Sequence, residues 1–340
     1  MKVSYSVLDL ATVIKDKTPA DTFKNSVDLA QHVEKLGYTR YWLAEHHNMA
    51  SVASSATAVL IGHIAGHTNT IRVGAGGIML PNHAPLIVAE QFGTLATLYP
   101  DRIDLGLGRA PGTDQITAME IRGERFHSPH HFPQDVRKLQ QYLSADPLDN
   151  RVRAIPGEGT EVPIWILGSS TESAHLAASY GLPYAFASHF APTYFREAIQ
   201  IYRQNFRPSA VLDQPYVLSC VNVVAAPSDE EAEYLSSSVK QLFLGIVSGK
   251  RKLLQPPVAD MDTIWNEMEA AAVAQMLAIA FIGGPATLQD QLSAFIAETQ
   301  VDEIMVTSHL YDHAARLTSY EIFASVMGRI EQSAKTKEQR

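Results

Sequence analysis

Apolar residues follow two alternating patterns along this chain. Short runs of apolar, aromatic and β-branched residues, first at positions 3–8 and 39–43, have the length and composition of strands. Between them, apolar residues recur every three or four positions, as at 21–36, which is the spacing of an amphipathic helix. The predicted strands are residues 3–8, 39–43, 70–81, 102–107, 162–167, 184–187, 216–224 and 303–307. The predicted helices are residues 21–36, 54–65, 86–98, 135–143, 173–180, 193–205, a long acidic segment after 228, 266–280, 285–298 and 314–330.

The order of these elements indicates an α/β protein with parallel strands. Strands that alternate with helices through short joints are connected by right-handed crossovers. This pattern fits both a closed (β/α)8 (TIM) barrel and an open doubly wound sheet. We interpret residues 1–333 as a single (β/α)8 barrel domain with insertions near 110–133, 146–161 and 245–265, and residues 334–340 as a frayed tail.

Three titratable residues in a row, Glu45, His46 and His47, follow the predicted strand at 39–43. Catalytic residues of (β/α)8 barrels come from the C-terminal ends of the strands, and an imidazole titrates near neutral pH. These three are therefore the candidate catalytic residues, and they favour the closed barrel. The alternative is a polar surface loop. His189 follows the strand at 184–187 and is a further candidate for the pocket.

Composition narrows the classes of partner. The chain has 340 residues, 46% of them hydrophobic, and a net charge of −9, which would repel the phosphates of a nucleic acid. A single cysteine, Cys220, excludes an internal disulfide framework and fits a reducing compartment. The N-terminus lacks the pattern of a signal peptide, and the apolar stretch at 270–282 is too short to span a bilayer. We therefore predict a cytoplasmic protein that binds neither nucleic acid nor membrane.

Glycines follow two of the predicted strands. Ala75, Gly76 and Gly77 offer nearly bare backbone against which a flat ligand could lie, or they form a simple bend. The segment from Gly106 to Gly112 imitates a dinucleotide fingerprint, but its third glycine is one residue late and a proline would disrupt the helix that should follow. We reject that reading and interpret Gly108 and Arg109 as a strand end that presents a cation to an anionic ligand.

Gly168, Ser169 and Ser170 lie between a predicted strand and the helix that contains Ser173. Backbone amides at the start of a helix, together with hydroxyl groups, can bind a phosphate without lysine. The alternative is an ordinary N-cap with spare serines.

Histidines elsewhere do not indicate a metal site. His63 and His67 have the helical spacing of metal ligands, but the glutamate of a zinc protease does not follow His63. His127, His130 and His131 lie in a polar loop without cysteines or paired carboxylates nearby, and we interpret them as solvated.

Four segments, taken together and in this order, resemble the bacterial luciferase-like flavin monooxygenase family, and within it a branch of single-chain oxidoreductases. The similarity extends from residue 4 to about residue 328. The segments are residues 42–47, 73–81, 105–109 and 167–170.

The resemblance implies a (β/α)8 barrel that binds reduced FMN at the C-terminal ends of its strands. It implies a monooxygenase in which the reduced flavin reacts with O2 to give a C4a-hydroperoxide, which then oxidises a small organic substrate. Because no nicotinamide site is predicted, a separate flavin reductase would supply the FMNH2. Relatives often dimerise, so a homodimer is one option for the oligomeric state.

The resemblance also assigns residues. His46 corresponds to the histidine implicated in catalysis, and the family's non-proline cis peptide beside the flavin ring corresponds to Gly76–Gly77. Arg109 corresponds to an arginine near the flavin phosphate. The resemblance does not place a second such arginine; Arg125 and Arg137 both lie in the segment that aligns poorly with the family. The phosphate-binding segment contains Ser169, Ser170 and Ser173.

Two other functions remain open from the sequence. The same barrel could bind deazaflavin F420 and act as a hydride-transfer dehydrogenase, although the acidic chain fits its polyanionic tail poorly. The protein could also bind flavin without catalysis. Neither reading names the organic substrate.

Overall fold

The computed structural model describes residues 2–123, 126, 131–146 and 151–338. Its strands are β1 (Ser4–Asp9), β2 (Arg40–Leu43), β3 (Arg72–Met79), β4 (Ile103–Gly108), β5 (Ile164–Gly168), β6 (Tyr184–Phe186), β7 (Val217–Ala225), β8 (Ala280–Gly283) and β9 (Glu303–Thr307). Its α-helices are α1 (Pro19–Lys35), α2 (Thr57–Gly66), α3 (Pro85–Leu98), α4 (Gln115–Arg122), α5 (Phe132–Leu143), α6 (Thr171–Tyr180), α7 (Phe195–Asn205), α8 (Asp229–Val247), α9 (Glu267–Met276), α10 (Pro285–Thr299) and α11 (His313–Glu338). Short 3-10 helices cover η1 (Leu80–Asn82) and η3 (Met261–Thr263).

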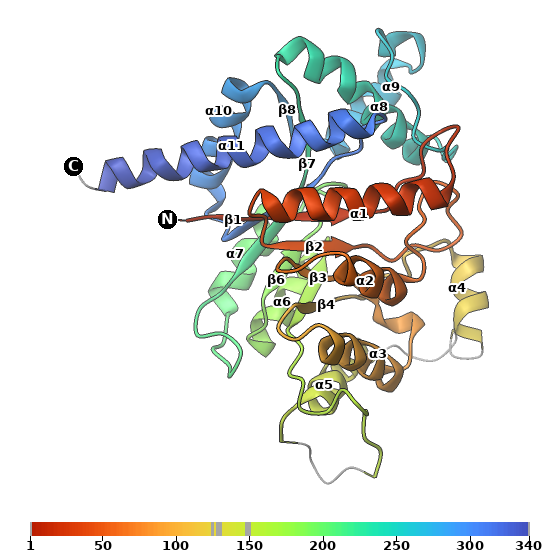
Figure 1. The fold of residues 1–340 in the computed structure, drawn as a ribbon, viewed down its shortest axis with the longest axis vertical. Helices are drawn as coiled ribbons and strands as arrows, with labels where there is room; N and C mark the ends of the chain where they lie inside the picture. The colour runs from red at the N-terminus through yellow and green to blue at the C-terminus, as the bar shows by residue number, and fades with distance from the viewer. Residues whose placement is uncertain (1, 124–125, 127–130, 147–150, 339–340) are drawn as a thin grey trace.

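Eight of the strands close into a parallel barrel. Hydrogen bonds join β1 through β6 in sequence order, then β6 to β7, β7 to β9 and β9 back to β1. The open doubly wound sheet is therefore excluded, and the predicted (β/α)8 fold is confirmed. Helices surround the barrel, and α11 runs beside α1 on its outside (Figure 1). In the same view β1 starts at the left and α4 lies at the right, on the side where the strands end.

β8 was not predicted as a strand. Ala280 was expected at the end of a helix, but α9 ends at Met276, and β8 pairs with the second half of β7, outside the closed barrel. The run from Leu277 to Gly283 is apolar and short, and such a run fits a helix or a buried strand equally well by pattern. Pairing with β7 decides between the two.

Two further segments differ from the sequence-based expectation. α4 is a helix inside the insertion expected near 110–133, where no helix was predicted, and Asp114 caps it by accepting a hydrogen bond from the Thr117 amide. α11 continues to Glu338, beyond the point where a frayed tail was expected.

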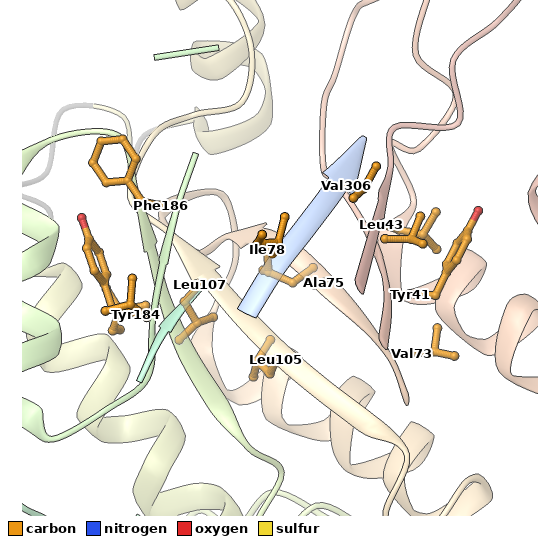
Figure 2. Packing of buried hydrophobic residues seen from close by; sticks show 14 of the residues in the cluster. Tyr41, Leu43, Val73, Ala75, Ile78, Leu105, Leu107, Tyr184, Phe186 and Val306 are labelled. Atoms are coloured by element: carbon orange, nitrogen blue, oxygen red, sulfur yellow. The ribbon is translucent and has the colours of Figure 1, made fainter. Parts of the chain in front are cut away.

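The hydrophobic core has two layers. Outward-facing strand residues pack under the helices; Figure 2 shows Tyr41, Val73, Leu105, Tyr184 and others of this layer. Inside the barrel a smaller cluster contains the residues Leu8, Trp42, Ala44, Trp165, Ala185, Leu218, Cys220 and Met305.

The two indole rings inside the barrel meet edge to face, with ring centroids 5.1 Å apart. Their bulk requires glycine on the neighbouring strands. A Cβ on Gly74 would lie 2.9 Å from Trp42 Nε1 and 2.5 Å from the Asp104 carbonyl oxygen.

A buried ion cluster fills the barrel interior near the N-terminal ends of the strands. Arg40 donates to Glu303 and to Asp104, each over 2.8 Å, and its guanidinium lies 4.6 Å from the ring centroid of Trp165. Side chains therefore fill the barrel interior at its N-terminal end, as is usual for this fold. Its C-terminal mouth is the end left available to a ligand.

Candidate functional site

Most of the residues singled out from the sequence lie on one arc of the barrel rim. β2, β3, β4 and β5 are neighbours in the sheet, and their registers align Leu43 with Ala75 and Met79 with Gly108. The strands are parallel, so the segments that follow them emerge at the same end of the barrel. These segments carry the Glu45–His47 sequence, the glycines, Arg109 and the serines.

Glu45 is a buried residue of this rim that accepts several hydrogen bonds. Its side chain is buried, and it accepts hydrogen bonds from His47 Nε2 (2.8 Å), His83 Nε2 (2.9 Å) and the Met79 amide (2.9 Å). Burial alone would raise the pKa of this carboxyl, but the hydrogen bonds and the nearby His83 outweigh burial and lower the pKa to about 2. Glu45 is therefore a carboxylate that ties β2 to the turn after β3.

His47 and His46 face different surroundings. His47 bonds Glu45, whereas the partly buried ring of His46 places Nδ1 3.0 Å from the Gly112 carbonyl oxygen. A carbonyl can only accept, so Nδ1 of His46 carries the proton and Nε2 holds the free lone pair. Burial lowers the pKa of His46 below its ordinary value. This environment favours the neutral imidazole, with a lone pair on Nε2.

The segment after β4 positions His46 through backbone contacts. Gly112 has φ +67°, and a Cβ there would lie 2.7 Å from the Glu45 carbonyl oxygen, so this position requires glycine. The Thr113 hydroxyl donates to the His47 carbonyl over 2.9 Å, and the Asn48 amide donates to Thr117 Oγ1 over 2.9 Å. The start of α4 is thereby fastened to the Glu45–His47 segment.

A cavity of about 210 Å³ lies beside His46. His189, which follows β6, lines it as proposed from the sequence, and His309, which follows β9, lines it too. Sequence reasoning missed His309, although its position just past a strand end was the same signal that identified His46. The lining residues are Leu10, Thr12, His46, Met49, Ser51, Val52, His189, Phe190, Leu242, Phe243, Ile246, Arg251, Met276 and His309.

The glycines of β3 are tightly packed near the rim. The Gly76–Gly77 peptide bond is cis, as the resemblance implied. A Cβ on Gly76 would lie 2.9 Å from Leu8 Cδ1, and one on Gly77 would lie 2.7 Å from the Gly106 carbonyl oxygen. Gly76 is partly accessible, so it presents bare backbone at the mouth. Such a surface fits a planar ring system.

Arg109 and the serine segment come together at the start of α6. The Arg109 side chain, which extends from the end of β4, forms an ion pair with Glu172 in the first turn of α6. Ser170 is the N-cap residue, but its side chain makes no capping hydrogen bond, so amides of the first turn keep their donor capacity. Ser173 instead donates to the Ser170 carbonyl over 2.8 Å.

Gly168 and Ser173 pack against each other below this helix start. A Cβ on Gly168 would lie 1.8 Å from Ser173 Oγ, so only glycine allows the strand to pass so close to the helix. Partly accessible hydroxyls at 169 and 170, free helix amides and one guanidinium fit a phosphate group.

Arg137 lies away from the start of α6. Its guanidinium lies over the ring of Tyr180, 4.8 Å from the centroid, at the far end of α6. A helix of this length spans about 15 Å, which is too far for a shared phosphate. Arg125, the other candidate, lies outside the described residues, as do His127 and His130.

In the part of the chain that the structure describes, three or more His, Cys, Asp or Glu side chains nowhere converge as the ligands of a metal ion would. None of the helices in the same residues combines the length and the hydrophobicity needed to cross a bilayer.

Known proteins resemble this chain over most of its length. Residues 1–303 match the sequence profile of a family described as luciferase-like monooxygenase. An Escherichia coli (strain K12) protein named luciferase-like monooxygenase is 48% identical over 95% of this chain and 97% of its own. The crystal structure of apo-MsnO8 superposes with a TM-score of 0.86 at 34% identity and covers 96% of this chain and 98% of its own.

More distant structures share the fold and differ in cofactor. The oxygenating constituent of 3,6-diketocamphane monooxygenase from Pseudomonas putida, solved with FMN, has a TM-score of 0.69 at 16% identity and covers 95% of this chain and 97% of its own. An F420-dependent secondary alcohol dehydrogenase has a TM-score of 0.69 at 15% identity and covers 97% of this chain and 99% of its own. Likeness at this level identifies the barrel and leaves the cofactor open.

Proposed function

The chain belongs to the luciferase-like monooxygenase family, and from this premise we propose that it uses reduced FMN and O2 to oxygenate a small organic substrate. The observation that carries the proposal is the arc at the barrel mouth. It joins a bare glycine backbone on β3, a guanidinium after β4 and an uncapped helix start after β5. A flat ring with an anionic tail has the shape and charge to match this arc.

The residues that would hold FMN fall into two groups. Ala75, Gly76 and Gly77 would support the ring. The phosphate would be held by Gly108, Arg109, Gly168, Ser169, Ser170 and Ser173. An entering phosphate would compete with Glu172 for Arg109, and exposed ion pairs of this kind are worth only about 0–1 kcal/mol. When bound, reduced FMN would supply the electrons that activate O2.

His46 would act as a general base. Its pKa is lowered by burial, so it is neutral at pH 7, and its Nε2 can remove a proton from the substrate. The carbonyl of Gly112 holds the ring, and Glu45 with His47 fixes the segment on which His46 lies. The largely apolar wall of the neighbouring cavity keeps water away from the reacting groups.

A separate reductase would supply the reduced cofactor. The glycines that imitate a dinucleotide fingerprint belong to β4, and α4 begins only at Gln115. The pyrophosphate of a nicotinamide cofactor needs a helix that starts directly after the glycines, and this segment does not offer one.

Titration with FMN and with F420, in oxidised and reduced forms, tests the cofactor. We expect FMN to bind and F420 to bind much more weakly. Preference for F420 would support the dehydrogenase reading, and binding of neither would refute a flavin enzyme.

Replacing His46 by alanine tests the reaction. We expect His46→Ala to bind FMN nearly as the wild type does and to lose substrate-dependent O2 consumption. The matched control is His175→Ala, which removes an exposed imidazole on α6. Undiminished oxygenation in His46→Ala would remove this residue from the mechanism. If no substrate among a broad pool supported turnover while FMN bound tightly, the protein would be a flavin-binding protein without catalysis.

A further inference from the structure

We propose that the substrate is a compact apolar carboxylic acid, with its carboxylate held by Arg251 and its apolar body inside the cavity beside His46. This inference rests on the proposed function, because it names the class of molecule that the same site would oxidise. The charge, the walls and the size of the cavity support this inference.

The described lining of the cavity carries one positive charge and no negative one. None of the residues that the structure places around it is an aspartate or a glutamate. Its three imidazoles are neutral at pH 7, since burial lowers the pKa of His46, of His189 to about 3 and of His309 to about 4. Among the described residues that line the cavity, Arg251 is therefore the only charged group. A cation in an otherwise uncharged pocket selects an anion at this point, although the chain as a whole has a net charge of −9.

Arg251 is available to a ligand. Its side chain lies at the exposed edge of the cavity, and its Nη1 lies 2.9 Å from Met49 Sδ, a weak acceptor. Among the residues that the structure describes, no carboxylate lies within ion-pair distance of it. A planar guanidinium matches the two oxygens of a carboxylate, which is why we infer a carboxylate rather than an uncharged polar group.

The segment that carries Arg251 is anchored to the barrel. Leu254, three residues later, is buried, and its amide and carbonyl bond Val13 (3.0 Å) and Lys15 (2.9 Å) in the loop after β1. The guanidinium is thus attached to a fixed stretch of backbone, although its side chain is accessible to solvent.

The remaining walls suit an apolar body. Leu242, Phe243 and Ile246 come from the last turns of α8, Met276 from the end of α9, and Phe190 from the segment after β6. The volume of about 210 Å³ is below the range of roughly 300–1,000 Å³ that is usual for drug-sized ligands. A short alkyl chain or a small ring fits, and a long fatty acid does not.

Calorimetric titration of the full-length protein with hexanoate and with hexan-1-ol tests the inference. We expect hexanoate to bind about tenfold more tightly, the lower end of the effect of a hydrogen bond to a charged group. Arg251→Gln should remove this difference and Arg251→Lys should keep part of it. The matched control Lys252→Gln removes an exposed cation next in sequence that does not line the cavity, and it should leave hexanoate binding unchanged.

Leu242→Ala tests the part of the cavity that would hold the apolar body of the ligand. This side chain is partly buried, so its truncation is tolerable for folding, and it should shift the preference from hexanoate towards octanoate. Equal binding of acid and alcohol, equal losses in Arg251→Gln and Lys252→Gln, or an unchanged chain-length preference in Leu242→Ala would each overturn the proposal.

Saturating FMN separates this inference from the proposed function. Hexanoate should still bind in its presence. If FMN displaces hexanoate, the cavity is part of the cofactor seat and the proposal fails while the flavin enzyme stands. If FMN does not bind at all but hexanoate binds through Arg251, the anion pocket stands and the flavin enzyme fails.

Discussion

Mild acid should destabilise this fold because two buried imidazoles at the barrel mouth resist protonation. Burial lowers the pKa of His189 to about 3, and burial with the nearby Arg316 guanidinium lowers that of His309 to about 4. Histidine in an unfolded chain titrates near pH 6.5. At pH 5 the unfolded chain therefore binds almost one proton at each position, and the native protein binds almost none.

The size of the effect follows from proton linkage. Because the unfolded state binds more protons, the free energy of unfolding falls as the pH falls. Between pH 7 and pH 5 each histidine removes ~2 kcal/mol, and the two together remove about 4 kcal/mol. The result depends little on the folded pKa values, since both lie below pH 5. A loss of this size is a large part of the ~5–15 kcal/mol by which domains are usually stable.

Urea unfolding at pH 7, 6 and 5 measures this loss, with the buried Trp42 and Trp165 as fluorescent reporters. His309→Gln should roughly halve it, because the amide can still bond Thr12 and Thr307 but does not titrate. If the substitution also destabilises the protein in a way that does not depend on pH, the plot of unfolding free energy against pH moves as a whole and its slope does not change. The slope is therefore the quantity to compare. A loss below about 1 kcal/mol in the wild type, or an unchanged slope in His309→Gln, would contradict this reasoning.

Three further predictions concern single side chains. Glu172→Gln should tighten FMN binding up to about fivefold in a fluorescence titration, because it frees Arg109 from an exposed ion pair worth at most ~1 kcal/mol; weaker binding would argue against a phosphate there. Glu45→Gln should lower the free energy of unfolding at pH 7 by about 3 kcal/mol, since the carboxylate pKa is lowered to about 2. The deficit should persist down to pH ~4.5 and shrink only as the pH falls towards the folded pKa; an equal deficit at pH 3 would count against it. Gly93→Ala should destabilise by ~1–3 kcal/mol in thermal unfolding, because its Cβ would lie 2.0 Å from Gly157 Cα. Helix propensity alone predicts that Gly93→Ala stabilises the protein. The control is Gln91→Ala, at an exposed position of the same helix.

The sequence predicted the architecture because the periodic pattern was strong in most elements. Eight strands and their alternation with helices follow from local composition, and closure into a barrel was favoured by Glu45–His47 at a strand tip. α4 was missed because it is short and lies among glycine, proline and histidine, where a local pattern has little weight. β8 was missed because only its contact with β7 distinguishes it from helix.

The sequence was sufficient to predict which residues belong to the candidate site. It was not sufficient to predict the contacts that they make. Residues that follow parallel strands must meet at one rim, so the grouping of His46 with Arg109 follows from topology. The bonds that His83 and the Met79 amide make to Glu45 depend on the η1 turn, which no motif in the sequence indicates. The lowered pKa of His46 likewise depends on burial by segments distant in sequence.

A crystal structure of the protein soaked with FMN tests the central claim most directly. We expect the ring to lie against Gly76 and Gly77 with an edge towards His46, and the phosphate to lie within hydrogen-bond distance of Arg109 and the start of α6. FMN bound elsewhere on the protein, or a rim that stays empty at saturating FMN, would contradict the account.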